Sequence, residues 1–156
     1  MSRKKQAPKR IFYPDAKYSS LVLAKFINFV MYDGKKATSE KIIYGALEKI
    51  KNKTKDDPIK IFNEAISNIR PNLEVRSRRV GGATYQVPVE IKYKRSQALA
   101  IRWLIAASKK RKGKIMSDKI SFELFDAYQG RGLAIKKKED THRMAESNKA
   151  FAHFRW

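Results

Sequence analysis

The sequence predicts a mainly α-helical single domain of about six helices with one β-hairpin at about residues 73–91. Apolar residues recur at helical spacing in six separate segments, and the period becomes extended only around Gly81-Gly82. The composition, 42% hydrophobic with 8 Phe, 7 Tyr and 2 Trp, supplies a core. A chain of this length buries roughly 68–70% of the surface of its unfolded form. We therefore expect one folded domain, residues 13–156, behind a basic flexible arm, residues 1–12.

The first half of the chain predicts three helices. Residues 1–10 are basic and contain no acid. Apolar residues at helical spacing from Ser19 predict a buried first helix that stops at Asp33-Gly34. A second helix is expected over residues 37–51, followed by a loop over residues 51–55. Asp57 as N-cap and Pro58 in the first helical position start a third helix, which ends by Arg70.

The spacing of apolar residues changes from helical to extended at the expected hairpin. Gly81-Gly82 can adopt the positive φ angles of a two-residue turn, which places Val80 opposite Ala83. The same register places Val75 opposite Pro88 in a non-hydrogen-bonded pair, where a missing N–H removes no ladder bond. One face then presents Arg76, Arg78 and Tyr85, and the other presents Arg79, Ser77, Thr84 and Gln86.

Helical periodicity returns in the second half. A fourth helix is expected over residues 94–108, and a basic loop over residues 109–114. Ser117 is predicted to cap a fifth helix that stops at Gly130. A sixth, highly charged helix over residues 133–147 leads to the tail aromatics Phe151, Phe154 and Trp156. These aromatics either pack on the domain or stack on RNA, and the sequence does not separate the two.

Catalytic and metal chemistry find no support in the sequence. No cysteine occurs, which excludes disulfides and thiolate sites. His142 and His153 are the only histidines and are expected on the surface. The acidic pairs Asp56-Asp57 and Glu139-Asp140 lie beside predicted helix ends and have no acid/base spacing. We predict no enzyme activity, no metal and no cofactor, and no apolar run approaches the ~20 residues of a membrane-spanning helix.

The charge points to a polyanion. Lys and Arg number 36 against 15 Asp and Glu, so the formal net charge is +21, and nucleic acid is the leading candidate partner. Arginine donates to phosphates and tyrosine stacks on bases, so we predict that the hairpin contacts RNA. The alternative is a solvated hairpin whose arginines only keep an edge strand from aggregating.

The fourth helix offers a second basic surface. Arg95, Arg102 and Lys109 lie seven residues apart and share a stripe, which alone is typical of a solvated face. Lys92 and Lys94 lead into this helix from the hairpin, so the two elements are predicted to form one surface. We expect Lys35, Lys36 and residues 109–114 to border this surface.

These segments resemble a known family. Residues 76–89, Arg-Ser-Arg-Arg-Val-Gly-Gly-Ala-Thr-Tyr-Gln-Val-Pro-Val, closely resemble the hairpin signature of the small-subunit ribosomal proteins of the S-seven family. The resemblance continues through Asp33-Gly34-Lys35-Lys36, Trp103-Leu104 and residues 127–145, and covers essentially the whole chain. The ending, residues 150–156, resembles bacterial members.

The resemblance implies a six-helix domain with a protruding hairpin, in the head of the small ribosomal subunit in the cytoplasm. It implies direct, early binding of the 3′ major domain of 16S rRNA, organisation of head assembly, and a hairpin near tRNA and mRNA at the exit site. Ribosomal proteins of the S-nine and S-eleven families would be neighbours. The residues expected to contact RNA are Arg3, Lys4, Lys5, Lys9, Arg10, Lys35, Lys36, Arg76, Arg78, Arg79, Gly81, Gly82, Tyr85, Lys92, Lys94, Arg95, Arg102, Lys109, Lys110, Arg111 and Lys114.

Three other functions compete with this hypothesis. A DNA-packaging protein would share the charge but prefer duplex DNA. An RNA-processing enzyme would need a metal or a general base that the sequence does not offer. A binder of anionic membranes would need an exposed apolar helix face beside its basic residues, which the pattern lacks.

Overall fold

The computed structural model describes residues 11–154, which form six α-helices, one two-stranded antiparallel sheet and a short 3-10 helix. The elements are α1 (Leu21–Val30), α2 (Lys36–Thr54), α3 (Pro58–Ile69), β1 (Leu73–Val80), β2 (Ala83–Glu90), α4 (Tyr93–Lys110), α5 (Met116–Tyr128), α6 (Leu133–Ser147) and η1 (Lys149–Phe154). The predicted fold class is confirmed. The arm residues Arg3, Lys4, Lys5, Lys9 and Arg10, and the tail residue Trp156, lie outside the described residues.

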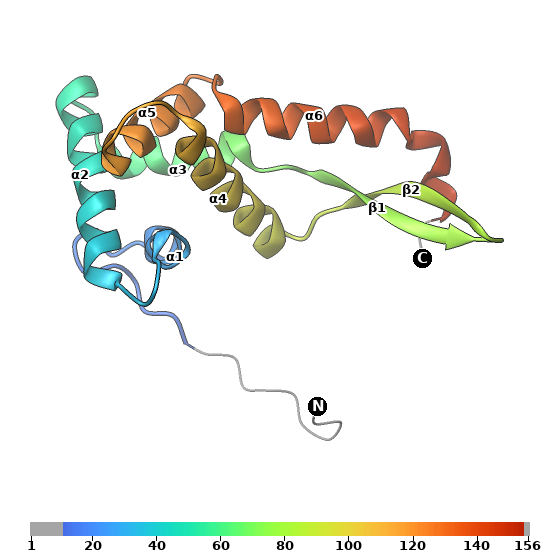
Figure 1. Cartoon of the computed structure of the whole chain (residues 1–156), viewed down its shortest axis with the longest axis horizontal. Coiled ribbons are helices and arrows are strands. Elements are labelled where there is room, and N and C mark those ends of the chain that lie inside the picture. The colour runs from blue at the N-terminus through green and yellow to red at the C-terminus, as the bar shows by residue number, and fades with distance from the viewer. Residues whose placement is uncertain (1–10, 155–156) are drawn as a thin grey trace.

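The hydrophobic core joins the helices at one end of the molecule. Figure 1 shows α2, α3, α4 and α5 gathered there, while α6 and the hairpin extend away together. Phe26 of α1 and Phe62 of α3 are fully buried with ring centroids 5.4 Å apart. Leu104 of α4 and Leu124 of α5 complete the same core. Only one side of α1 is buried, however: Leu21 and Phe29 are exposed, so the expectation of a buried first helix is wrong for its outer face.

Two helices run further than their sequence pattern predicts. The expected loop over residues 51–55 is wrong, because α2 continues to Thr54, whose Oγ1 donates to the Ile50 carbonyl at 2.9 Å. Likewise Lys109 and Lys110 belong to the last turn of α4 and not to a loop. Lysines in a last turn lie against the negative end of the helix dipole, so such runs are compatible with a helix end.

Helix starts gave one correct and one wrong prediction. Asp57 caps α3 as expected, since its Oδ1 accepts from the Ile59 N–H at 3.1 Å and Pro58 follows at the first position. Ser117 does not cap α5, because that helix already begins at Met116. Ser117 is buried, and its Oγ accepts from the Lys49 Nζ at 3.2 Å. The serine therefore joins α5 to α2.

The hairpin has the predicted register. Val80 lies opposite Ala83 and Val75 opposite Pro88. The two turn glycines have φ angles of +58° and +89°, a conformation that a side chain would strain. The predicted turn and pairing are confirmed.

The hairpin also has a protein partner along one side. Figure 1 shows α6 running beside it and η1 turning back toward it from the end of α6. Val87 is fully buried, and the Tyr85 ring lies 5.2 Å from that of Phe151 in η1. Of the two fates that the sequence left open for the tail aromatics, Phe151 therefore packs on the protein.

Candidate nucleic-acid interface

The hairpin tip carries one of the exposed arginines that are predicted to contact RNA. Arg79 is exposed next to the turn and, among residues 11–154, it forms no ion pair. Ser77 and Gln86 on the same face bond each other, with the Gln86 Nε2 donating to the Ser77 Oγ at 2.9 Å. Arg78 on the opposite face is partly exposed. Arg79 is therefore available to a ligand at the tip.

Tyr85 occupies a different environment from the one the sequence predicts. Its ring is partly buried and contacts Phe151 at a tilt of 47°. This contact covers part of the ring, so less of its surface is available for base stacking than in a solvated hairpin. The tyrosine helps to attach the hairpin to η1.

At the base of the hairpin, one carboxylate bonds two of the arginines that are predicted to contact RNA. Glu74 is buried in β1, and its oxygens accept from the Arg95 Nε at 2.9 and 3.0 Å and from the Arg76 Nε at 2.7 Å. Burial alone would raise the pKa of Glu74, but the hydrogen bonds and charges of Arg95 and Arg76 outweigh it and lower the pKa. Both arginine side chains stay about half exposed. The pairing fixes the hairpin to the start of α4.

The α4 stripe exists as predicted. Arg95, Arg102 and Lys109 are all exposed along one helix, as are Lys92 and Lys94 where the chain enters it. Lys92 and Lys109 nevertheless lie about 25 Å apart along the helix axis, because each residue advances it by about 1.5 Å. The surface is therefore a line of cations that begins at the hairpin.

The remaining predicted lysines lie at the borders of the helical end. Lys35 and Lys36 are exposed at the start of α2, where Lys36 forms a 3.6 Å pair with Glu40. Lys110 is exposed at the C-terminal end of α4, and Lys114 is exposed in the segment between α4 and α5.

Arg111 has an internal role that the sequence did not indicate. Its Nε donates to Glu123 at 2.5 Å, and a terminal nitrogen donates to Asp126. Burial lowers the pKa of Arg111, but the bonds to the two carboxylates outweigh it and raise the pKa. Glu123 is fully buried and also accepts from the Ala134 N–H at 3.0 Å. The guanidinium is thus engaged by two carboxylates of α5, and contact of Arg111 with RNA stays a prediction.

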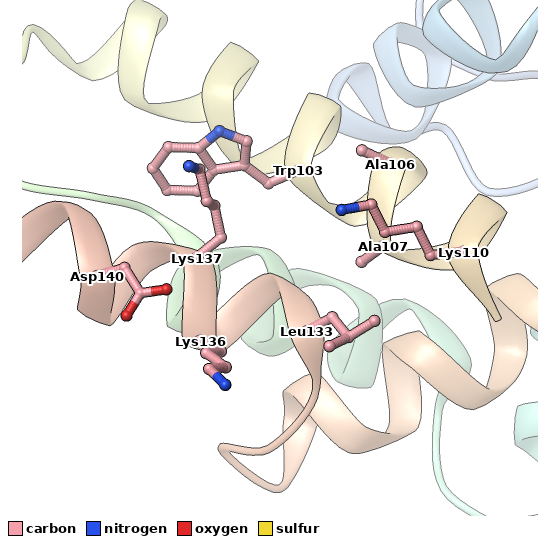
Figure 2. Close-up of a pocket in the computed structure, with 8 residues that line it drawn as sticks. All are labelled: Trp103, Ala106, Ala107, Lys110, Leu133, Lys136, Lys137 and Asp140. Atoms are coloured by element: carbon pink, nitrogen blue, oxygen red, sulfur yellow. The ribbon is translucent and has the colours of Figure 1, made fainter.

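Sequence reasoning missed a group of residues between α4 and α6. Trp103 of α4 lines a groove there together with Lys136 and Lys137 of α6, as Figure 2 shows. The sequence predicts α6 only as a highly charged helix, and mixed charges of this kind are typical of an exposed helix face. Its Asp140 and Arg143 do form an ion pair of that kind, at 3.4 Å. The run of three lysines at 136–138 was the available signal.

The two histidines differ in their surroundings. His153 is exposed, as expected. His142 lies on the surface but is only partly exposed, and its Nε2 accepts from the Asn72 N–H at 3.1 Å. Burial, together with the charge of Lys138, lowers the pKa of His142 and favours this neutral acceptor form. The ring connects α6 to the start of the hairpin.

These features define a class of protein: a helical scaffold that displays fixed cations along a hairpin and an adjoining helix. No three His, Cys, Asp or Glu side chains within residues 11–154 gather where they could hold a metal ion. No helix of that part of the chain has the length and apolar content needed to cross a bilayer.

Comparison with known proteins identifies the family. Residues 2–149 match the family described as Ribosomal protein S7p/S5e, and the chain belongs to this family. It is 67% identical to the small ribosomal subunit protein uS7 of Pelagibacter ubique and 62% identical to that of Paramagnetospirillum magneticum. It is 58% identical to that of Rhodospirillum centenum. Each alignment covers all 156 residues and the whole of both chains. Members of this family are structural constituents of the small ribosomal subunit and not enzymes, and rRNA binding is general among them.

Proposed function

We propose that this chain binds the 3′ major domain of 16S rRNA directly and organises assembly of the head of the small subunit. In the same proposal, the hairpin lies at the exit site and approaches tRNA and mRNA. The line of cations from the hairpin along α4 is the observation that carries the proposal. Family membership supports ribosomal RNA as the polyanion.

Electrostatics explains how such a line binds. Each lysine or arginine placed against a phosphate releases condensed counterions, so affinity falls as the salt concentration rises. Arg102 and Lys109 are suited to this because they are exposed and form no ion pair within residues 11–154. These contacts provide affinity without reading base sequence.

Specificity follows from the fixed angle between the two basic elements. Side chains do not enter the deep, narrow major groove of an A-form helix, so folded RNA is recognised by its shape and its unpaired bases. Glu74 ties β1 to α4 through Arg95, and His142 ties the start of the hairpin to α6. A surface held at both points fits one arrangement of RNA helices better than a uniform duplex.

The protein neighbours in this proposal are ribosomal proteins of the S-nine and S-eleven families. Their support is the resemblance of the whole chain to the S-seven family. Co-assembly of the three proteins on one 16S fragment, followed by cross-linking, tests this part. Absence of cross-links between this chain and both neighbours would remove it.

Binding to a transcript of the 3′ major domain tests the central claim. We expect tight binding that an excess of duplex DNA does not displace at near-physiological salt. The Arg102→Gln/Lys109→Gln variant should bind more weakly, with a slope of log affinity against log salt that is smaller by about 2. The control Lys51→Gln/Lys60→Gln removes the same charge from exposed positions of α2 and α3 outside the candidate interface. Equal weakening by both variants, or displacement by DNA, would contradict the proposal.

The hairpin tip requires a separate test. We expect Arg79→Gln to leave assembly of the head unchanged and to lower the yield of tRNA cross-links at the exit site in reconstituted subunits. An unchanged yield would remove the tip from the exit site.

A further inference from the structure

The groove between α4 and α6 has no assigned role. Its cavity volume is about 370 Å³, within the range of roughly 300–1,000 Å³ typical of small-ligand sites. Lys110 is the only residue lining it that was expected to contact RNA. Figure 2 shows side chains of both helices directed toward one space. The lining residues are Trp103, Ala106, Ala107 and Lys110 of α4, and Leu133, Lys136, Lys137 and Asp140 of α6.

The floor of the groove is apolar and aromatic. Trp103 packs against the hydrophobic core and remains partly exposed at the groove. Leu133, at the start of α6, is 46% exposed. An indole with accessible surface between apolar neighbours is suited to a flat ligand that can stack on it.

The rim of the groove is cationic. Lys110, Lys136 and Lys137 are exposed, and none of them forms an ion pair within residues 11–154. The one carboxylate that lines the groove, on Asp140, already has Arg143 at 3.4 Å. Lys138 points elsewhere, because its Nζ donates to the Asn68 carbonyl at 2.7 Å. The charge around the groove is therefore complementary to an anion.

We propose that this groove binds one unpaired nucleotide of the RNA. The base stacks on the Trp103 indole, and the flanking phosphates lie against Lys136 and Lys137. The Asp140 carboxylate accepts a hydrogen bond from a base amino group or a 2′-hydroxyl. This inference rests on the proposed function and adds to it a defined subsite with residues of α6.

A nucleotide fits these observations better than an acidic peptide. Aspartate and glutamate side chains satisfy lysines but offer no planar ring for the exposed indole. A nucleotide supplies a π face and a phosphate together, and base stacking on aromatic side chains tolerates any sequence.

Fluorescence of Trp103 reports on the site directly. The chain has 2 Trp, so Trp156→Phe leaves Trp103 as the only tryptophan in an otherwise complete protein. We expect quenching of its emission when a transcript of the 3′ major domain is added, with the affinity of the parent protein retained. A peptide of glutamates, added as a second probe, should leave the emission unchanged.

Variants separate stacking from charge. Trp103→Leu should weaken binding of the transcript about tenfold, within the range expected for the loss of one base stack. Trp103→Phe should retain most of the affinity, because a smaller ring still stacks. Lys136→Gln/Lys137→Gln should weaken binding to a similar extent, whereas the charge-matched Lys51→Gln/Lys60→Gln should not. Circular dichroism checks the fold of each variant, and the Trp156→Phe experiment holds even where Trp103→Leu does not fold.

The outcomes are distinct. Tight RNA binding with unchanged Trp103 emission, and with parental affinity in Lys136→Gln/Lys137→Gln, would overturn the nucleotide site and leave the proposed function intact. Quenching by the glutamate peptide and not by RNA would assign the groove to an acidic protein partner and overturn the inference. Failure of the parent protein to bind the transcript would overturn the proposed function and this site with it.

Discussion

Different interactions stabilise the helical end of the molecule and the hairpin. The core cluster consists of residues from α1 to α6, and most of its members have almost no exposed surface. The hairpin contributes nothing to that cluster, and its own fully buried side chain is Val87. It is attached through the Glu74–Arg95 pair, the Asn72–His142 hydrogen bond and the Tyr85–Phe151 contact.

This difference separates stability from recognition. Burial of apolar surface stabilises the helical end, so its basic residues are carried on a framework that tolerates their mutual repulsion. The hairpin packs on α6 and η1 and not in the core cluster, so changes there should alter its position and mobility without unfolding the helices. Four changes, in order of decreasing effect, test the contrast.

Phe62→Ala should have the largest effect. The ring is fully buried against Phe26, and its removal should lower the free energy of unfolding by about 3–5 kcal/mol. Urea unfolding followed by circular dichroism measures this. Phe122→Ala is the matched control, because Phe122 is 53% exposed and its loss should have much less effect. Equal losses in the two variants would contradict the assigned core.

Glu123→Gln should be next. Glu123 is fully buried, and the change removes the charge that pairs with Arg111 and accepts from the Ala134 N–H of α6. Removal of one member of a buried pair costs about 3–5 kcal/mol, and partial exposure of Arg111 reduces our expectation to about 2 kcal/mol. Glu48→Gln, at an exposed position of α2, should be neutral in the same assay. An unchanged free energy of unfolding in Glu123→Gln would show that the packing of α4, α5 and α6 does not depend on this carboxylate.

Phe151→Ala should affect the hairpin alone. Loss of the ring contact with Tyr85 removes about 0.5–1.5 kcal/mol beyond the buried area. Amide hydrogen exchange should quicken in β2 and stay unchanged in α3. Tyr32→Ala, which removes a ring that is 78% exposed, should leave both rates unchanged. Faster exchange throughout α3 would mean that the hairpin and the helices unfold as one unit.

Acid should have the smallest effect, at the base of the hairpin. The pKa of Glu74 lies below its ordinary value of 4.5 in the folded protein, so the unfolded chain takes up its proton first as the pH falls. The contribution of Glu74 to stability is therefore complete above pH 4.5 and is lost as the pH falls through the folded-state pKa. Melting temperatures of the parent should drop more steeply below pH 4.5 than those of Glu74→Gln. Identical acid slopes would show that the pair adds no stability.

Local rules recovered the parts of the fold that depend on neighbours in sequence. The hairpin register follows from Gly81-Gly82 and Pro88, and the start of α3 follows from Asp57. The ends of α2 and α4 were placed too early, because lysine runs are equally typical of loops and of last helical turns.

The candidate site was harder to predict than the fold. Charge located the exposed stripe on α4, but it could not show that Arg111 meets Glu123 or that Arg95 meets Glu74, because these pairs join separate elements. The groove at Trp103 depends in the same way on the packing of α6 against α4. Pairings of this kind are set by the tertiary structure and leave no period in the sequence.

Glu123 lies at the point where α6 begins, and its carboxylate bonds the two neighbouring segments of the chain. The carboxylate accepts from Arg111 at the end of α4 and from the Ala134 N–H at the start of α6, so this one side chain joins the two helices where α6 begins. Helix α6 has 15 residues and is therefore about 22 Å long. A tilt of about ten degrees at its origin would carry η1 sideways by about 4 Å, given that length. A small tilt of α6 at Glu123 would therefore produce a larger displacement of η1, where Phe151 contacts Tyr85 of the hairpin.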